Sequence, residues 1–206
     1  MDAVALAVAW AGPVVAAGAW AAVRLGGVSI WAAMGWSAGS LGLLSLLTGW
    51  VEPGGGLAEI LIGLGAGLAL YAATAVFLHL VRGWVLLARH THEVYSWRRG
   101  MPLGAVLAIA CLIVAPGEEA LWRGLVQGRL AAAMGEATAA AAGWALYVLG
   151  NLASASAPIV LGAAVGGAVW AGLALWTGGI LASVGCHVVW TGLMILRPPS
   201  GEGPPG

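Results

Sequence analysis

The chain has 206 residues, of which 61% are hydrophobic and only 8% are charged. A soluble globular domain carries roughly a quarter charged residues, so this composition indicates an integral membrane protein with the lipid bilayer as its surroundings. Eight acidic residues balance eight arginines, and lysine is absent. A chain without net charge has no broad field to attract nucleic acid, and we expect no nucleic-acid partner.

Apolar runs separated by short polar or Gly/Pro-rich segments predict an all-α, polytopic bundle of about seven transmembrane helices, because a spanning helix needs about 20 mostly apolar residues. The predicted helices cover residues 3–23, 28–51, 57–81, 101–115, 137–153, 158–176 and 179–196. Glycines four residues apart, such as Gly63 and Gly67, would let helices approach closely in lipid. We expect one domain over residues 1–197, with the polar motifs in 101–197, and a disordered Pro/Gly-rich tail over 198–206.

The positions of the arginines predict the orientation. Arg24 follows the first predicted helix, four arginines lie between residues 82 and 99, and Arg197 follows the last helix. Arginine-rich connections mark the cytoplasmic side, so all of these share that side if the N-terminus is outside. Arg123 and Arg129 do not fit this pattern and need a reason other than topology.

Two other groups of reactive side chains have simpler interpretations. The spacing of His90, His92 and Glu93 could bind a metal, but their arginine-rich surroundings favour a solvated cytosolic loop. Cys111 and Cys186 lie within apolar segments, which favours small core residues over a disulfide or a thiolate metal site.

Two adjacent glutamates, Glu118 and Glu119, interrupt the apolar sequence and are followed by Arg123. Each ionised group at membrane depth costs about 2.5 to 3.5 kcal/mol, so the cluster predicts a functional site. Pro116 and Gly117 are expected to end one helix and to place both glutamates in the first turn of the next. Glu119 can pair with the arginine four residues on, which leaves Glu118 for general-base activation of a water. The alternative is a capped helix start with an ordinary ion pair.

Two further polar pairs lie in predicted helices. His187 and Thr191 share a helix face, where the histidine could donate to an oxyanion or be a satisfied core histidine. Tyr147 and Asn151 are also four apart, and interhelical hydrogen bonding is their simplest interpretation. We expect Asn151 and His187 to border one polar cavity with the glutamates and the arginine, since each would be costly facing lipid.

The segment E-E-A-L-W-R-G-L-V-Q, from Glu118 to Gln127, resembles the first motif, E-E-x-x-x-R, of the CPBP family of intramembrane CAAX-prenyl endopeptidases and bacteriocin-processing proteins. The resemblance covers residues 115–196, and the later motifs follow in the family's order. It implies that Glu118 is the base of a glutamate-dependent hydrolysis inside a helical bundle.

The family's other two motifs are altered. F-x-x-x-H aligns with Tyr147 to Asn151, and H-x-x-x-N aligns with His187 to Thr191. The resemblance implies that the second-motif histidine helps the glutamate and that the third motif stabilises the oxyanion, here through His187. Asn151 replaces the helping histidine and cannot accept a proton near neutral pH, whereas Thr191 still offers a hydroxyl donor. Without a second histidine, zinc is disfavoured, and we expect no cofactor.

The resemblance implies an intramembrane endopeptidase that cleaves membrane-anchored peptides or C-terminal protein tails. The expected catalytic residues are Glu118, Glu119, Arg123, Asn151, His187 and Thr191. Some bacterial members serve protein-sorting systems, and the lysine-free, Trp-rich composition suits a bacterial inner membrane. The alternative is an inactive relative that binds transmembrane segments as a chaperone, immunity factor or scaffold. A small transporter is disfavoured because the charges cluster in one half and no inverted repeat is visible.

Overall fold

The computed structural model describes residues 2–199, and these residues form eight helices and no β-strand. The eight helices are α1 (Asp2–Arg24), α2 (Ile30–Leu47), α3 (Leu57–Leu80), α4 (Val85–Ser96), the long helix (Leu103–Met134), α8 (Glu136–Leu152), α9 (Ala157–Thr177) and α10 (Leu181–Leu196). The part of the expected tail from residue 200 onward lies outside the described residues.

Seven of these helices correspond to the seven predicted segments, and α4 is the additional one. Five helices are long and apolar enough to cross a membrane, namely α1, α2, α3, the long helix and α9, while α10 is a shorter apolar helix. The predicted all-α, polytopic membrane bundle is therefore confirmed.

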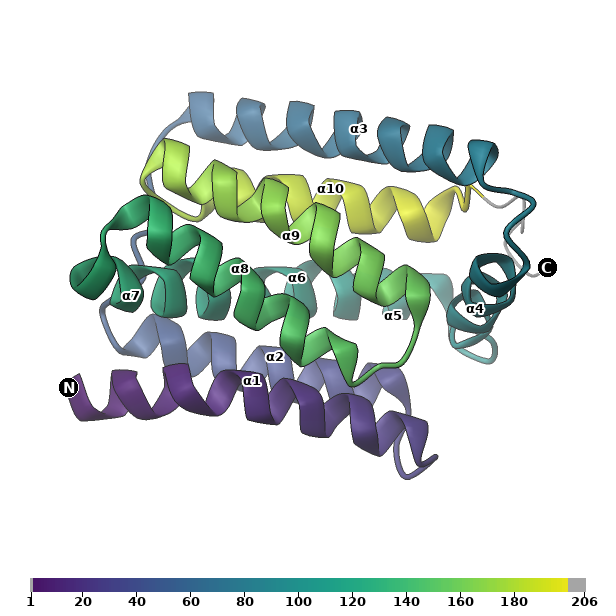
Figure 1. Cartoon of the computed structure of the whole chain (residues 1–206), viewed down its shortest axis with the longest axis horizontal. Coiled ribbons are helices and arrows are strands. Elements are labelled where there is room, and N and C mark those ends of the chain that lie inside the picture. The colour runs from purple at the N-terminus through teal and green to yellow at the C-terminus, as the bar shows by residue number, and fades with distance from the viewer. Residues whose placement is uncertain (1, 200–206) are drawn as a thin grey trace.

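The long helix runs through the middle of the bundle (Figure 1). It contacts α2 on one side and α10 on the other, and α10 in turn packs along α3. Helix α1 lies beside α2, and α8 lies beside α9. Other helices therefore surround the long helix on several sides, and its polar residues face them.

Glycines bring the central helices close together. A Cβ atom on Gly63 would lie 2.5 Å from the carbonyl oxygen of Ala182, and one on Gly67 would lie 2.7 Å from Cβ of Val189. The predicted close approach at this pair is thus confirmed, between α3 and α10. A Cβ atom on Gly42 would likewise run into the backbone of Gly117, so α2 and the long helix touch backbone to backbone.

Helix α4 and the C-terminal ends of α1 and α10 lie toward one end of the bundle (Figure 1), and the arginines outside the long helix belong to these segments or to their neighbouring connections. Arg24 Nη1 donates to the carbonyl oxygen of Ala153, 3.3 Å away, at the end of α8. Arg98 Nη1 donates to the carbonyl oxygen of Ile195, 2.9 Å away, near the end of α10. The grouping agrees with the predicted shared side, and which side is cytoplasmic stays a prediction.

The segment expected to be a solvated loop is helical instead. Helix α4 buries Leu87 and Thr91, four residues apart, so one of its faces packs on the bundle. His90 Nδ1 accepts a hydrogen bond of 3.1 Å from the backbone N–H of Ala157, at the start of α9. The interpretation of this histidine as a solvated loop residue was therefore wrong, because the segment is amphipathic.

The helix expected to end at Pro116 continues through it. The long helix is built from α5 (Leu103–Ala108), the π-helical η1 (Ile109–Val114), α6 (Ala115–Glu119), the π-helical η2 (Ala120–Val126) and α7 (Gln127–Met134). Proline lacks the N–H that an α-helix requires. In the wider turn before it, the N–H of Ala115 donates five residues back to Ala110, and such π turns absorb local irregularity. The glutamates therefore lie in mid-helix and not in a first turn.

Candidate active site

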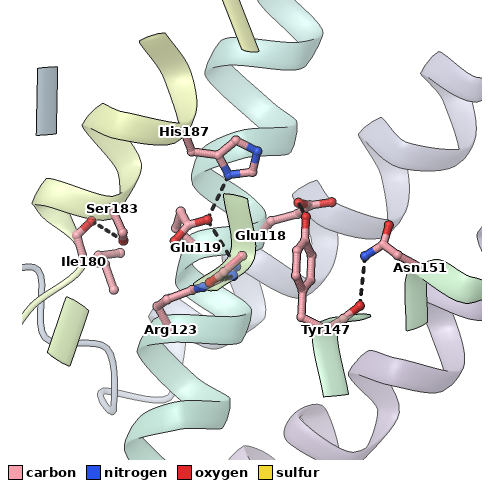
Figure 2. Close-up of polar contacts among 9 residues, drawn as sticks. Glu118, Glu119, Arg123, Tyr147, Asn151, Ile180, Ser183 and His187 are labelled. Carbon is pink, nitrogen blue, oxygen red and sulfur yellow. Dashed lines mark hydrogen bonds and ion pairs between the residues drawn. The ribbon is translucent and has the colours of Figure 1, made fainter. Parts of the chain in front are cut away.

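Glu119 is the centre of a buried polar cluster in the bundle (Figure 2). Its side chain has no exposed surface, and its Oε1 lies 3.3 Å from Arg123 Nη1 and 2.8 Å from His187 Nδ1. The predicted pairing of Glu119 with Arg123 is confirmed. The contact with His187 joins the long helix to α10, and spacing along the sequence did not indicate it.

Arg123 is buried, and its guanidinium lies among the Glu119 carboxylate, a backbone carbonyl and two aromatic rings. Nη2 donates to the carbonyl oxygen of Gly167 at 3.0 Å. Its Cζ atom lies 4.6 Å from the ring centre of Tyr147 and 5.4 Å from that of Trp170. A desolvated cation is stabilised by such ring faces and by an anion beside it. The misfit of Arg123 with the topology pattern is explained by this site.

Trp170 fixes the imidazole of His187 from α9. The two rings are stacked with their centres 3.6 Å apart and their planes 13° from parallel. Trp170 is 1% exposed, and it also meets Trp190 edge to face at 5.7 Å. Sequence reasoning did not indicate this contact. The available signal was the position of Trp170, well inside the predicted helix over 158–176.

Glu118 lies on a different side of the long helix, since neighbouring residues are about 100° apart. It is partly exposed, in contrast to Glu119. The hydroxyl of Tyr147, on α8, donates to Glu118 Oε2 over 2.8 Å. Figure 2 shows the tyrosine between Glu118 and Asn151. Glu118 thus accepts a hydrogen bond from a neutral donor, whereas the Arg123 guanidinium is paired with Glu119.

Asn151 is turned away from the glutamates by its own hydrogen bonds. Its Oδ1 accepts from Trp20 Nε1 at 3.0 Å, and its Nδ2 donates to the carbonyl oxygen of Tyr147 at 2.9 Å. The predicted interhelical hydrogen bonding is confirmed, for Asn151 with α1 and for Tyr147 with the long helix. Both polar groups of the amide are engaged, and neither bond goes to Glu118.

Comparison with known families agrees with this arrangement. The model of the family described as type II CAAX prenyl endopeptidase, Rce1-like, matches residues 101–193, which run from the long helix almost to the end of α10. This part of the chain is similar to the Rce1-like family. The resemblance to CPBP proteins is confirmed. No curated protein and no solved structure matches the chain.

Within the matched segment, Thr191 lies one helical turn beyond His187 and is partly exposed. A groove of about 590 Å³ opens between α3, the long helix and α10. Apolar residues such as Leu107 and Val188 line it, with Cys111 among them. The glutamates do not line it, so it is not the predicted polar cavity. Both cysteines are free, as expected.

Three charged or titratable groups of the site have distinct chemical roles. Glu118 offers a carboxylate for proton transfer. His187 lies with Nδ1 against Glu119, and since a carboxylate only accepts, Nδ1 carries the proton there. Arg123 balances the charge of Glu119. Among residues 2–199, no three His, Cys, Asp or Glu side chains lie together in a way that could hold a metal ion.

Proposed function

We propose that this chain is an intramembrane endopeptidase that uses Glu118 to activate a water and cleaves membrane-anchored peptides or C-terminal protein tails. One observation carries the proposal: Glu119 contacts both Arg123 and His187, and all three are buried among membrane helices beside the partly exposed Glu118. A bilayer penalises each of these groups, so their clustering indicates a function. The Rce1-like match over residues 101–193 supports the same reaction.

Each residue has a role in hydrolysis of the peptide bond. Glu118 takes a proton from water as the water oxygen bonds to the carbonyl carbon, and the glutamate returns that proton to the leaving nitrogen when the C–N bond breaks. His187, oriented by Glu119 and Trp170, keeps its Nδ1–H on Glu119 and, in its protonated form, donates from Nε2 to the oxyanion that forms on the carbonyl oxygen. Thr191 lies one turn away and offers its hydroxyl as a second donor to the oxyanion. Arg123 holds Glu119 in its ionised form, and no step requires a cofactor.

The finer proposal places the protein in a bacterial inner membrane, in a system that sorts exported proteins by removing their membrane anchors. The lysine-free, Trp-rich composition supports a bacterial host. The gathering of arginines at the α4 end supports a cytoplasmic position for that end.

The test uses the full chain in liposomes with two reporters, a prenylated peptide ending in a CAAX sequence and a protein with a C-terminal transmembrane anchor. Wild type is expected to release the tail of at least one reporter. Glu118→Gln should reduce release by at least about 100-fold, the scale of a lost general base, while the folded yield is unchanged. Glu136→Gln, at the exposed start of α8, is the matched control and should cleave normally. Equal cleavage by wild type and Glu118→Gln would remove the glutamate from the mechanism.

A second candidate is a catalytically inactive relative that binds transmembrane segments. The bonds of Asn151 favour it, because the residue in place of the second-motif histidine is occupied by Trp20 and a backbone carbonyl. Asn151→His separates the two. If the wild type and this variant both leave every reporter intact, and the uncleaved anchor copurifies equally with wild type and with Glu118→Ala, binding is the better account.

A further inference from the structure

The hydroxyl of Tyr147 is the group that the described hydrogen bonds place on Glu118. Oη of Tyr147 donates to Glu118 Oε2 at 2.8 Å across the interface of α8 and the long helix. Figure 2 shows the phenol pointing at this carboxylate. A phenol O–H is a neutral donor with the geometry to fix one carboxylate oxygen.

The ring of Tyr147 is held on several sides, so its hydroxyl has a fixed position. It is 6% exposed and meets Trp122 edge to face with ring centres 5.5 Å apart. Trp170 lies on another side at 6.3 Å, and the Arg123 guanidinium lies 4.6 Å from the ring centre. A donor whose side chain cannot rotate away orients its acceptor without losing conformational entropy at each turnover.

The neighbouring candidate for the same task is excluded by its contacts. Asn151 lies one turn along α8, but its Oδ1 accepts from Trp20 and its Nδ2 donates to the carbonyl oxygen of Tyr147 itself. These bonds tie Asn151 to α1 and to the turn that carries the tyrosine. The Asn151 amide therefore stabilises the helix that carries Tyr147 and forms no hydrogen bond with Glu118.

We propose that Tyr147 is the positioning residue of Glu118, holding Oε2 so that Oε1 receives the proton of the attacking water; this role rests on the proposed endopeptidase function. The proton of water moves to Oε1 as the new C–O bond forms, and it passes from Oε1 to the leaving nitrogen as the C–N bond breaks. Tyr147 keeps its own proton throughout. The hydroxyl thus supplies from α8 an orientation that Asn151 does not.

The test compares Tyr147→Phe with Tyr71→Phe in the full chain, on whichever reporter the wild type cleaves. Tyr147→Phe removes one oxygen and keeps the packed ring. Tyr71→Phe removes a hydroxyl that donates to the carbonyl oxygen of Arg197 at 2.6 Å, outside the polar cluster. We expect kcat to fall about 10- to 100-fold in Tyr147→Phe, the effect of one hydrogen bond to a charged group. We expect KM to stay within about twofold, and Tyr71→Phe to match wild type in both constants.

An infrared measurement reads the same contact without turnover. The carboxylate band that disappears in Glu118→Gln should shift in Tyr147→Phe and stay in place in Tyr71→Phe. Normal kcat with an unshifted band in Tyr147→Phe overturns the inference and leaves the endopeptidase intact. Absence of wild-type cleavage overturns the proposed function, and the positioning role with it, whatever the band does. If Tyr147→Phe folds poorly, fluorinated tyrosine at position 147 keeps the ring and hydroxyl, and an unchanged band and kcat there count equally against the inference.

Discussion

Replacing Glu119 by glutamine tests whether the buried ion pair holds the bundle together. The carboxylate is fully buried and faces Arg123 at 3.3 Å and His187 at 2.8 Å through one oxygen. Glutamine keeps the shape and an acceptor oxygen but removes the charge, so the guanidinium is left in the bundle with the carbonyl of Gly167 and two ring faces. Breaking a buried pair from one side costs about 3 to 5 kcal/mol. Because the amide oxygen still accepts, we expect about 3 kcal/mol.

The free energy of unfolding can be measured in mixed micelles by titration with a denaturing detergent. Glu119→Gln should lower it the most, Glu118→Gln should cost about 1 kcal/mol for one weakened hydrogen bond, and the exposed control Glu136→Gln should not change the midpoint. Glu119→Gln is also expected to lower the folded yield, whereas Glu118→Gln is not.

A double variant isolates the charge effect. Arg123→Met together with Glu119→Gln removes both charges, and replacing a buried pair by uncharged groups is often neutral. The double variant should therefore be more stable than Glu119→Gln alone. A Glu119→Gln protein that unfolds at the wild-type midpoint, or a double variant in which the two losses simply add, would refute the assignment of Glu119 as the structural partner.

Three further outcomes are expected. Trp170→Leu removes the ring stacked on the His187 imidazole and should lower cleavage about 10- to 100-fold because the imidazole is misoriented. Trp170→Phe should retain most of the wild-type cleavage. Equal cleavage by wild type and Trp170→Leu would show that stacking is not required. Gly117→Ala should cost about 1 to 3 kcal/mol, because its Cβ meets the backbone of α2, whereas Gly172→Ala, whose Cβ meets nothing within 4 Å, should be neutral or stabilising in the same unfolding assay. Trp20→Phe should cost about 1 kcal/mol through loss of the donor to Asn151, and a variant with unchanged stability would show that this bond contributes nothing.

The helices could be predicted because lipid makes the signal strong. A spanning segment must satisfy its backbone internally and be apolar over its length, so long apolar runs identify helices well. The prediction that a helix ends at Pro116 was wrong because the expectation that proline breaks a helix describes an isolated helix. Here a π turn precedes it, and Gly117 packs closely against α2. Such local adjustments and neighbouring helices allow a proline within a transmembrane helix.

The site was predictable only where its contacts lie within one helix. Glu119 and Arg123 are four apart, and spacing alone predicted their pairing. The contact of His187 with Glu119 spans 68 positions, and the bond from Trp20 to Asn151 spans 131. Such contacts depend on which helices pack together, and periodicity along one helix carries no information about that. Composition singles out polar groups in lipid, but their partners come from the fold.

The first two helices lie outside the matched segment 101–193, yet they build part of its framework. The indole of Trp20 secures Asn151, and the backbone of α2 at Gly42 fits against Gly117, immediately before the glutamates. Exchanging residues 101–193 between two relatives would thus place each motif-bearing segment against the first two helices of the other protein. In such a chimera the residues at positions 20 and 151 would have to be exchanged together. The part of the chain that must stay together to keep this site is therefore longer than the segment that carries its motifs.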